Sequence, residues 1–148
     1  MATYEIRETI NAPTDKVFAM FADLPNAAEN IESILSIEFL SEQHTGLGTR
    51  WKETRKIFGK EQTEEMWISD YQEGRSYTVS SDSCGSDFTT ALEFTPSGGG
   101  TEVVMTMHVK PRTTMAKVMA PLGFFFAGVF KKCMKADIDD LRQKLTAA

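Results

Sequence analysis

The chain has 148 residues, of which 41% are hydrophobic, and a formal net charge of −5 at pH 7. We expect one domain over residues 1–148, and the acidic balance argues against nucleic acid, whose binding depends on clustered Lys and Arg. Cys84 and Cys133 have no Cys or His at the spacing of a zinc site, so we expect reduced thiols and no metal.

The first part of the chain predicts a strand and two short helices. Alternating apolar residues indicate a half-buried strand: Tyr4, Ile6 and Ile10. Pro13 suits a first helical turn, and apolar residues then follow at helical spacing: Val17, Phe21 and Leu24. Pro25 ends this helix and opens a second short one, after which residues 34–40 predict a strand.

The segment from Leu47 to Lys110 predicts an antiparallel meander. Turn residues separate its strands: Gly59, Glu73-Gly74, Cys84-Gly85 and Ser97 to Gly100. Alternating apolar residues mark one face of the later strands: Tyr77, Val79, Leu92, Phe94, Val103, Met105, Met107 and Val109. That face must be covered by another layer.

The C-terminal segment supplies the cover. Its apolar residues keep a helical period over about six turns: Leu122, Phe126, Val129, Phe130, Cys133, Met134, Ile138, Leu141 and Leu145. We expect the first three to lie against the sheet, and Pro121 and Gly123 to break or kink the start of the helix. The predicted fold is therefore α+β, with a curved antiparallel sheet of about six or seven strands around a long C-terminal helix.

The location of the protein is predicted from what the chain lacks. Residues 1–7 have no basic head followed by an apolar stretch, so nothing resembles a signal peptide. The longest apolar stretch, 120–130, has about half of the 20 or so residues that a membrane-spanning helix needs. We expect a cytoplasmic protein without a transmembrane span. Transient contact with a membrane is compatible with this expectation.

The third and fourth strands allow a prediction of register. If Phe58-Gly59 is a two-residue turn, one face carries complementary or matching partners: Lys52 with Glu65, Thr54 with Thr63, and Lys56 with Glu61. The other face carries Trp51 opposite Met66, Glu53 opposite Glu64, and Arg55 opposite Gln62. Because apolar residues lie at one end of this second face, we expect it to point inward.

Glu53 and Glu64 are the candidate catalytic residues. Facing carboxylates near a cavity mouth repel each other, and such a pair can act as a general acid or base. The alternative is a hairpin tip in water, with Arg55 neutralising the pair diagonally. We expect His44 in a polar loop and His108 on the outer face, and the sequence lacks the motifs of hydrolases, nucleotide-dependent enzymes and metalloenzymes.

The order of elements resembles the START-like superfamily, which includes polyketide cyclases, plant pathogenesis-related allergens and lipid carriers. Four local signals carry the likeness to bacterial polyketide cyclase, dehydrase and lipid-transport members: residues 11–18 (NAPTDKVF), 46–51 (GLGTRW), 99–103 (GGTEV) and 137–141 (DIDDL). The resemblance covers the whole chain. It implies a helix-grip fold with a cavity between sheet and helix, which ligands enter near the loops and the N-terminal end of the helix.

Three functions are consistent with this sequence. The first is binding or transport of a hydrophobic small molecule, such as a lipid, quinone or polyketide-like compound. The second is a cyclase or dehydratase that uses Glu53 or Glu64, and the third is an interaction or dimerisation module that uses residues 124–126 or the outer face with Trp67. No cofactor is implied, and the oligomeric state is open. The candidate ligand-binding residues are Trp51, Arg55, Met66, Tyr77, Phe94, Met105, Met107, Leu122, Phe126 and Val129.

Overall fold

The computed structural model describes residues 2–57, 59–83, 85–119 and 127–146. Its elements follow one another as β1 (Ala2–Ile10), α1 (Thr14–Phe21), the 3-10 helix η1 (Leu24–Asn26), α2 (Ala27–Asn30), β2 (Ile34–Phe39), β3 (Arg50–Ile57), β4 (Lys60–Gln72), β5 (Ser76–Ser83), β6 (Ser86–Ser97), β7 (Gly100–Pro111), α3 (Thr114–Met119) and α4 (Ala127–Thr146). The predicted strand and two short helices after it are confirmed, the second of them as η1 followed by α2.

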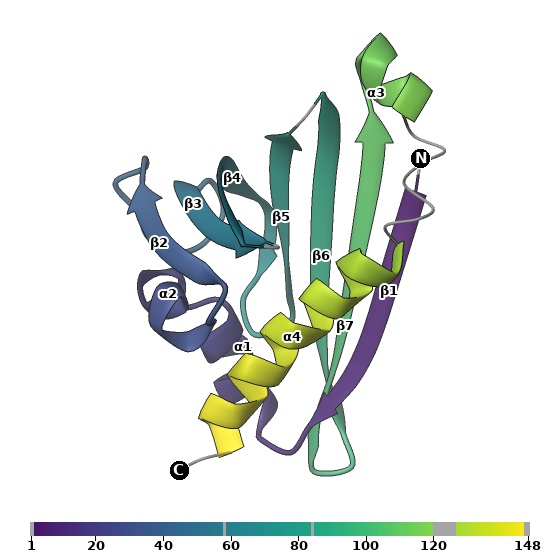
Figure 1. Ribbon diagram of the computed structural model, residues 1–148. Helices are drawn as coiled ribbons and strands as arrows, with labels where there is room; N and C mark the ends of the chain where they lie inside the picture. The colour runs from purple at the N-terminus through teal and green to yellow at the C-terminus, as the bar shows by residue number, and fades with distance from the viewer. Residues whose placement is uncertain (1, 58, 84, 120–126, 147–148) are drawn as a thin grey trace.

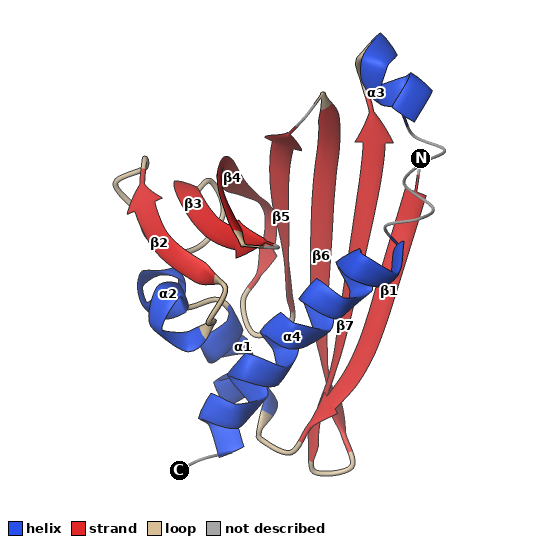
Figure 2. Ribbon diagram, viewed as in Figure 1, coloured by secondary structure: helices blue, strands red, loops and turns tan. Residues whose placement is uncertain are grey.

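The seven strands form one antiparallel sheet in the order β1-β7-β6-β5-β4-β3-β2. Six of them therefore follow the chain as a meander, and β1 joins the open edge beside β7. Figure 1 shows α4 running diagonally across one face of the sheet, with α1 and α2 near its C-terminal end and α3 beyond the opposite end of the sheet. The layering of helices on one face of the sheet is clear in Figure 2.

The β6–β7 hairpin meets the end of β1 closely. A Cβ atom on Gly100 would stand 2.5 Å from the carbonyl oxygen of Ile10, which is too close for a backbone contact. Thr101, the next residue, is fully buried, and its hydroxyl donates to the carbonyl of Ala12 at 2.9 Å. These contacts fix the turn from β1 into α1 against the sheet.

The best-packed part of the core lies between α1, α4 and the sheet. The ring of Phe18 makes edge-to-face contacts with Tyr71, Tyr77 and Phe94, at centroid distances of 5.7, 5.9 and 5.2 Å. α4 adds Met134, Ile138 and Leu141, which are buried as the helical period predicted. The predictions for Leu122, Phe126 and residues 124–126 lie outside the described residues, as does the side chain of Val129.

The register of β3 and β4 is the one predicted. Lys52 pairs with Glu65, Glu53 with Glu64 and Arg55 with Gln62, and the Thr54 and Thr63 hydroxyls are 2.8 Å apart. The charge pattern differs from the prediction in one detail. Glu65 lies opposite Lys52, but its carboxylate forms an ion pair with Arg50 at 2.8 Å. No helix in the described ranges is long and apolar enough to cross a membrane.

Candidate ligand site on the inner face of the sheet

The inner face of β3 carries Trp51, Glu53 and Arg55, as the predicted parity requires. Trp51 is 1% exposed and Glu53 is 5% exposed, whereas Arg50 and Lys52 on the other face are exposed. Glu53 therefore lies inside the protein, whereas the described end of the hairpin, from Lys60 to Thr63, is exposed. The alternative that placed the carboxylate pair in water is wrong for Glu53.

Among the apolar inward side chains of β5 to β7, burial falls off from the α1 end toward the α3 end. Near α1, the inward side chains of β5, β6 and β7 are buried: Tyr77, Leu92, Phe94, Val103 and Met105. Nearer α3, the inward apolar side chains of β4 to β7 are half-buried: Met66, Val79, Phe88, Met107 and Val109. Tyr4, Ser81 and Ser86 in the same region are buried. The described helices thus cover the α1 half of the face closely and leave a mainly apolar surface partly open in the other half.

A charged network stands at one side of this surface and joins β3 to α4. Arg55 donates from Nε to Glu53 Oε2 at 2.7 Å, and from Nη1 and Nη2 to the two carboxylate oxygens of Asp137 at 3.1 and 2.8 Å. Its Nη1 also reaches the hydroxyl of Ser33 at 3.0 Å, and Trp51 Nε1 donates to Glu53 Oε1 at 3.3 Å. The Arg–Asp contact is a two-pronged ion pair, which fixes orientation as well as distance.

The electrostatics of this network favour a structural role for Arg55. Burial works against the charge of its guanidinium, but Asp137 and then Glu53 outweigh that effect, so the pKa of Arg55 is raised. Burial raises the pKa of the Asp137 carboxyl, and attraction to Arg55 opposes the rise. The two-pronged contact fixes the position of α4 over β3.

Asp137 and Ser33 are functional neighbours that the sequence analysis missed. A signal for Asp137 was present, because it lies three residues after Met134 and four before Leu141, on the apolar stripe of the helix. A carboxylate at such a position needs a partner from the opposite layer. No comparable pattern marked Ser33, which lies just before β2.

Tyr77 and the two histidines have defined surroundings. The hydroxyl of Tyr77 donates to the carbonyl of Phe21 at 3.0 Å, and burial raises the pKa of Tyr77, so the phenol stays neutral and holds α1 to β5. His108 lies 3.0 Å from the hydroxyl of Thr3 on the outer face, as predicted. His44 is exposed in the loop before β3 and stacks on Phe39.

A curved antiparallel sheet with a partly open apolar inner face, crossed by a long C-terminal helix, defines the helix-grip class of proteins (Figure 1). A family model described as polyketide cyclase / dehydrase and lipid transport matches residues 1–148. The chain belongs to this family. None of the curated proteins matches the sequence.

Solved structures share the fold at low sequence identity. The crystal structure of Ara h 8.0201 aligns with a TM-score of 0.81 at 18% identity and covers 99% of each chain. Ginseng major latex-like protein 151 from Panax ginseng aligns at 0.77 with 9% identity, over 98% of this chain and 97% of that one. The di-domain ARO/CYC protein StfQ, from the steffimycin biosynthetic pathway, aligns at 0.79 with 10% identity over 97% of this chain and 50% of its own.

Proposed function

We propose that the protein binds or carries a hydrophobic small molecule between the inner face of the sheet and α4. The observation that carries this proposal is the uneven burial of the inner face. Met66, Val79 and Met107 are half-buried, although Leu92 and Met105, in the row next to Val79 and Met107 on the same face, are buried. Apolar side chains that stay partly exposed to water are unfavourable in free energy. A bound apolar ligand would cover them and so offset this cost.

The family and the fold support the same proposal at a coarser level. The family model names lipid transport together with polyketide cyclase and dehydrase activities. We take residues 1–148 as one binding domain and expect it to bind its ligand in the cytoplasm. The candidate contacts on the described side chains are Met66, Met107 and Val79, with Trp51 at the edge of the charged network.

Arg55 is a poor candidate for direct contact with a ligand. Its Nε, Nη1 and Nη2 atoms already donate to Glu53, Ser33 and Asp137. These bonds use four of the five guanidinium N–H groups and pair the charge with two carboxylates, so an anionic headgroup would gain little there and would meet repulsion from Glu53 and Asp137. We therefore infer that apolar contacts, and not a salt bridge to Arg55, select the ligand.

The hydrogen bonds of Glu53 weigh against the cyclase or dehydratase alternative. A general base needs a carboxylate oxygen that is free to reach the substrate. Glu53 Oε2 is 2.7 Å from Arg55 Nε, and Oε1 accepts from Trp51. Both carboxylate oxygens of Glu53 thus already accept hydrogen bonds within the network. The geometry therefore supports binding better than acid–base catalysis.

Native mass spectrometry tests the proposal on protein purified from its own host without detergent. A retained mass that disappears after organic extraction, and returns with an added lipid or quinone, is the expected result. The control is a variant that fills the inner face, Val79→Phe, compared with Thr78→Phe on the outer face of the same strand. Equal retention by both variants would contradict a site on the inner face.

A further inference from the structure

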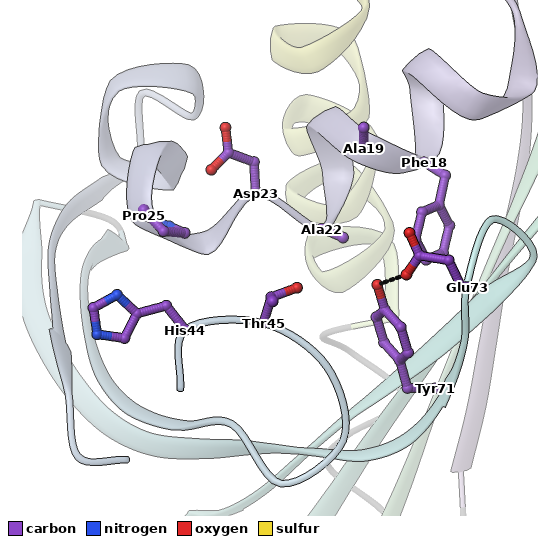
Figure 3. Close-up of a pocket in the computed structure, with 9 residues that line it drawn as sticks. All are labelled: Phe18, Ala19, Ala22, Asp23, Pro25, His44, Thr45, Tyr71 and Glu73. Carbon is purple, nitrogen blue, oxygen red and sulfur yellow. Dashed lines mark hydrogen bonds between the residues drawn. The ribbon is translucent and has the colours of Figure 1, made fainter. Parts of the chain in front are cut away.

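A concave site lies outside the sheet–α4 space. It is a pocket of about 330 Å³ between the last turn of α1, the start of η1, the loop from 40 to 49 and the β4–β5 turn (Figure 3). The lining is mainly apolar and consists of Phe18, Ala19, Ala22, Asp23, Pro25, His44, Thr45, Tyr71 and Glu73. Phe18 and Tyr71, in edge-to-face contact, belong both to this wall and to the aromatic core behind it.

The loop that forms one wall is held in place by its own hydrogen bonds. Gln43 Nε2 donates to the carbonyl of Leu47 at 2.5 Å, and the backbone N–H of Gly48 donates to the carbonyl of Ile68 at 3.0 Å. His44 stacks on Phe39 with ring centroids 3.9 Å apart. The pocket is therefore formed before any ligand arrives, which reduces the entropic cost of binding.

The charges at the pocket have one sign. Glu73 lies on the β4–β5 turn, where it accepts a hydrogen bond from the hydroxyl of Tyr71 (Figure 3). Asp23 lies at the junction of α1 and η1, on the rim of the pocket; its carboxylate points away from the Tyr71–Glu73 pair and accepts from Asn26 Nδ2 at 2.9 Å. Over the described ranges, no ion pair involves either carboxylate. The last turn of α1, which also lines the pocket, contains no basic residue.

The C-terminal end of α1 also lies at the pocket. The end of a helix dipole favours cations, but here the carbonyls of Phe18, Met20, Phe21 and Ala22 already accept hydrogen bonds, so the contribution of the helix is small. The ring of Tyr71 lines the same pocket, and aromatic rings attract ammonium groups. Carboxylates without a counter-charge and an aromatic wall thus favour the same kind of ligand.

We propose that this pocket binds a small organic ammonium ion, with its apolar body against Phe18, Ala22 and Tyr71 and its charge toward Glu73. The site is independent of the hydrophobic ligand proposed for the inner face, because none of Met66, Val79 and Met107 lines it. A lone metal ion is a poorer match, because most of the lining is apolar.

Three matched probes test the charge preference: benzylamine, benzyl alcohol and benzoate, each titrated into ¹⁵N-labelled protein at pH 7.5. We expect benzylamine to shift the amide signals of Ala22, Thr45 and Gly74. We expect it to bind at least about fivefold more tightly than benzyl alcohol, and benzoate to cause no shift. Equal binding of the amine and the alcohol, or no binding of the amine, would overturn the proposal.

Substitutions locate the site. Glu73→Gln keeps the hydrogen-bond acceptors and should weaken benzylamine binding about threefold to tenfold, whereas Asp23→Asn, on the rim, should weaken it less. Glu93→Gln, at an exposed position on the outer face of β6, is the control and should change nothing. If Glu73→Gln behaves like Glu93→Gln, or if the shifts map to Thr90, Met107 and Val109, the amine is not bound in this pocket. The second result would leave the inner-face proposal intact.

Discussion

Arg55 is the residue on which the charged network depends, because its guanidinium is the shared partner of Glu53 and Asp137. Replacing Arg55 with Met would leave two buried carboxylates facing each other without a counter-charge. We expect a loss of about 3 to 5 kcal/mol in the free energy of unfolding at pH 7, measured by urea denaturation. Arg7→Met is the control, since Arg7 is exposed and its ion pairs should contribute less than about 1 kcal/mol.

The same variant has a predictable dependence on pH. Burial raises the pKa of Asp137 above its unfolded value, and removing Arg55 removes the attraction that opposes the rise. The folded protein then binds a proton more tightly than the unfolded chain, so its relative stability increases as pH falls through the folded pKa toward about 4. The difference in the free energy of unfolding between the wild type and Arg55→Met should therefore become smaller from pH 7 to pH 5. A gap that stays constant or widens would show that Asp137 is not desolvated.

The structure changes one expectation for Glu53. Repulsion from Glu64 alone predicts that Gln at position 53 leaves stability equal or higher. Because Glu53 is 2.7 Å from Arg55, Glu53→Gln instead removes a charge-assisted hydrogen bond and should cost about 1 to 2 kcal/mol in urea denaturation. For Glu64→Gln, equal or higher stability stays the prediction. An unchanged midpoint for Glu53→Gln would mean that the ion pair adds nothing.

At the scale of elements, two methionines on β7 give a matched test of the uneven inner face. Met105 is 8% exposed and pairs with Leu92, whereas Met107 is half-buried two residues further toward α3. We expect Met105→Ala to cost about 2 to 4 kcal/mol, and Met107→Ala to cost about 1 kcal/mol or less in the ligand-free protein. Equal losses, measured by thermal and urea unfolding, would mean that the core extends evenly along β7.

The helix period makes a further prediction for Phe126, which lies outside the described residues. Phe126→Ala should cost roughly 3 to 5 kcal/mol if the side chain belongs to the core, and much less if it lines a cavity. An unchanged unfolding midpoint with lost ligand binding would assign Phe126 to the site. An unchanged midpoint with unchanged binding would contradict both assignments.

Sequence reasoning is effective where local rules decide the structure. The β3–β4 register follows from the position of Gly59 and the pairing of Lys52 with Glu65, because a short hairpin turn fixes which residues face each other. The contact of Arg55 with Asp137 could not be predicted in this way. It depends on the angle at which α4 crosses the sheet, and that angle results from packing between segments far apart in the chain.

The surface pocket shows the same limit. His44 and Tyr71 are distant in sequence, and they line one space only because the loop from 40 to 49 folds back toward α1. That loop is shaped by hydrogen bonds such as Thr49 Oγ1 to the carbonyl of Gly46 at 2.9 Å, which no periodicity in the sequence reveals. Predicting inward and outward faces is therefore easier than predicting the hollows between elements.

At the scale of the whole molecule, the two proposed sites lie in different parts of one scaffold. α1 and the aromatic contacts of Phe18 separate the surface pocket from the core, and the network of Arg55 sets α4 over the inner face. Methionines are suitable reporters of this arrangement. Met66 and Met107 lie on the half-buried part of the inner face, Met134 lies in the core, and Met115 is 73% exposed on α3.

Methyl NMR of the ¹³C-methionine-labelled protein, titrated with oleate and separately with menadione, tests the central claim most directly. If a hydrophobic ligand binds between the sheet and α4, the methyl signals of Met66 and Met107 shift and saturate together, and Val79→Phe abolishes the shifts while Thr78→Phe preserves them. Shifts confined to Met115, or unsaturable shifts that both variants share, would contradict the claim that the inner face of the sheet is the binding site.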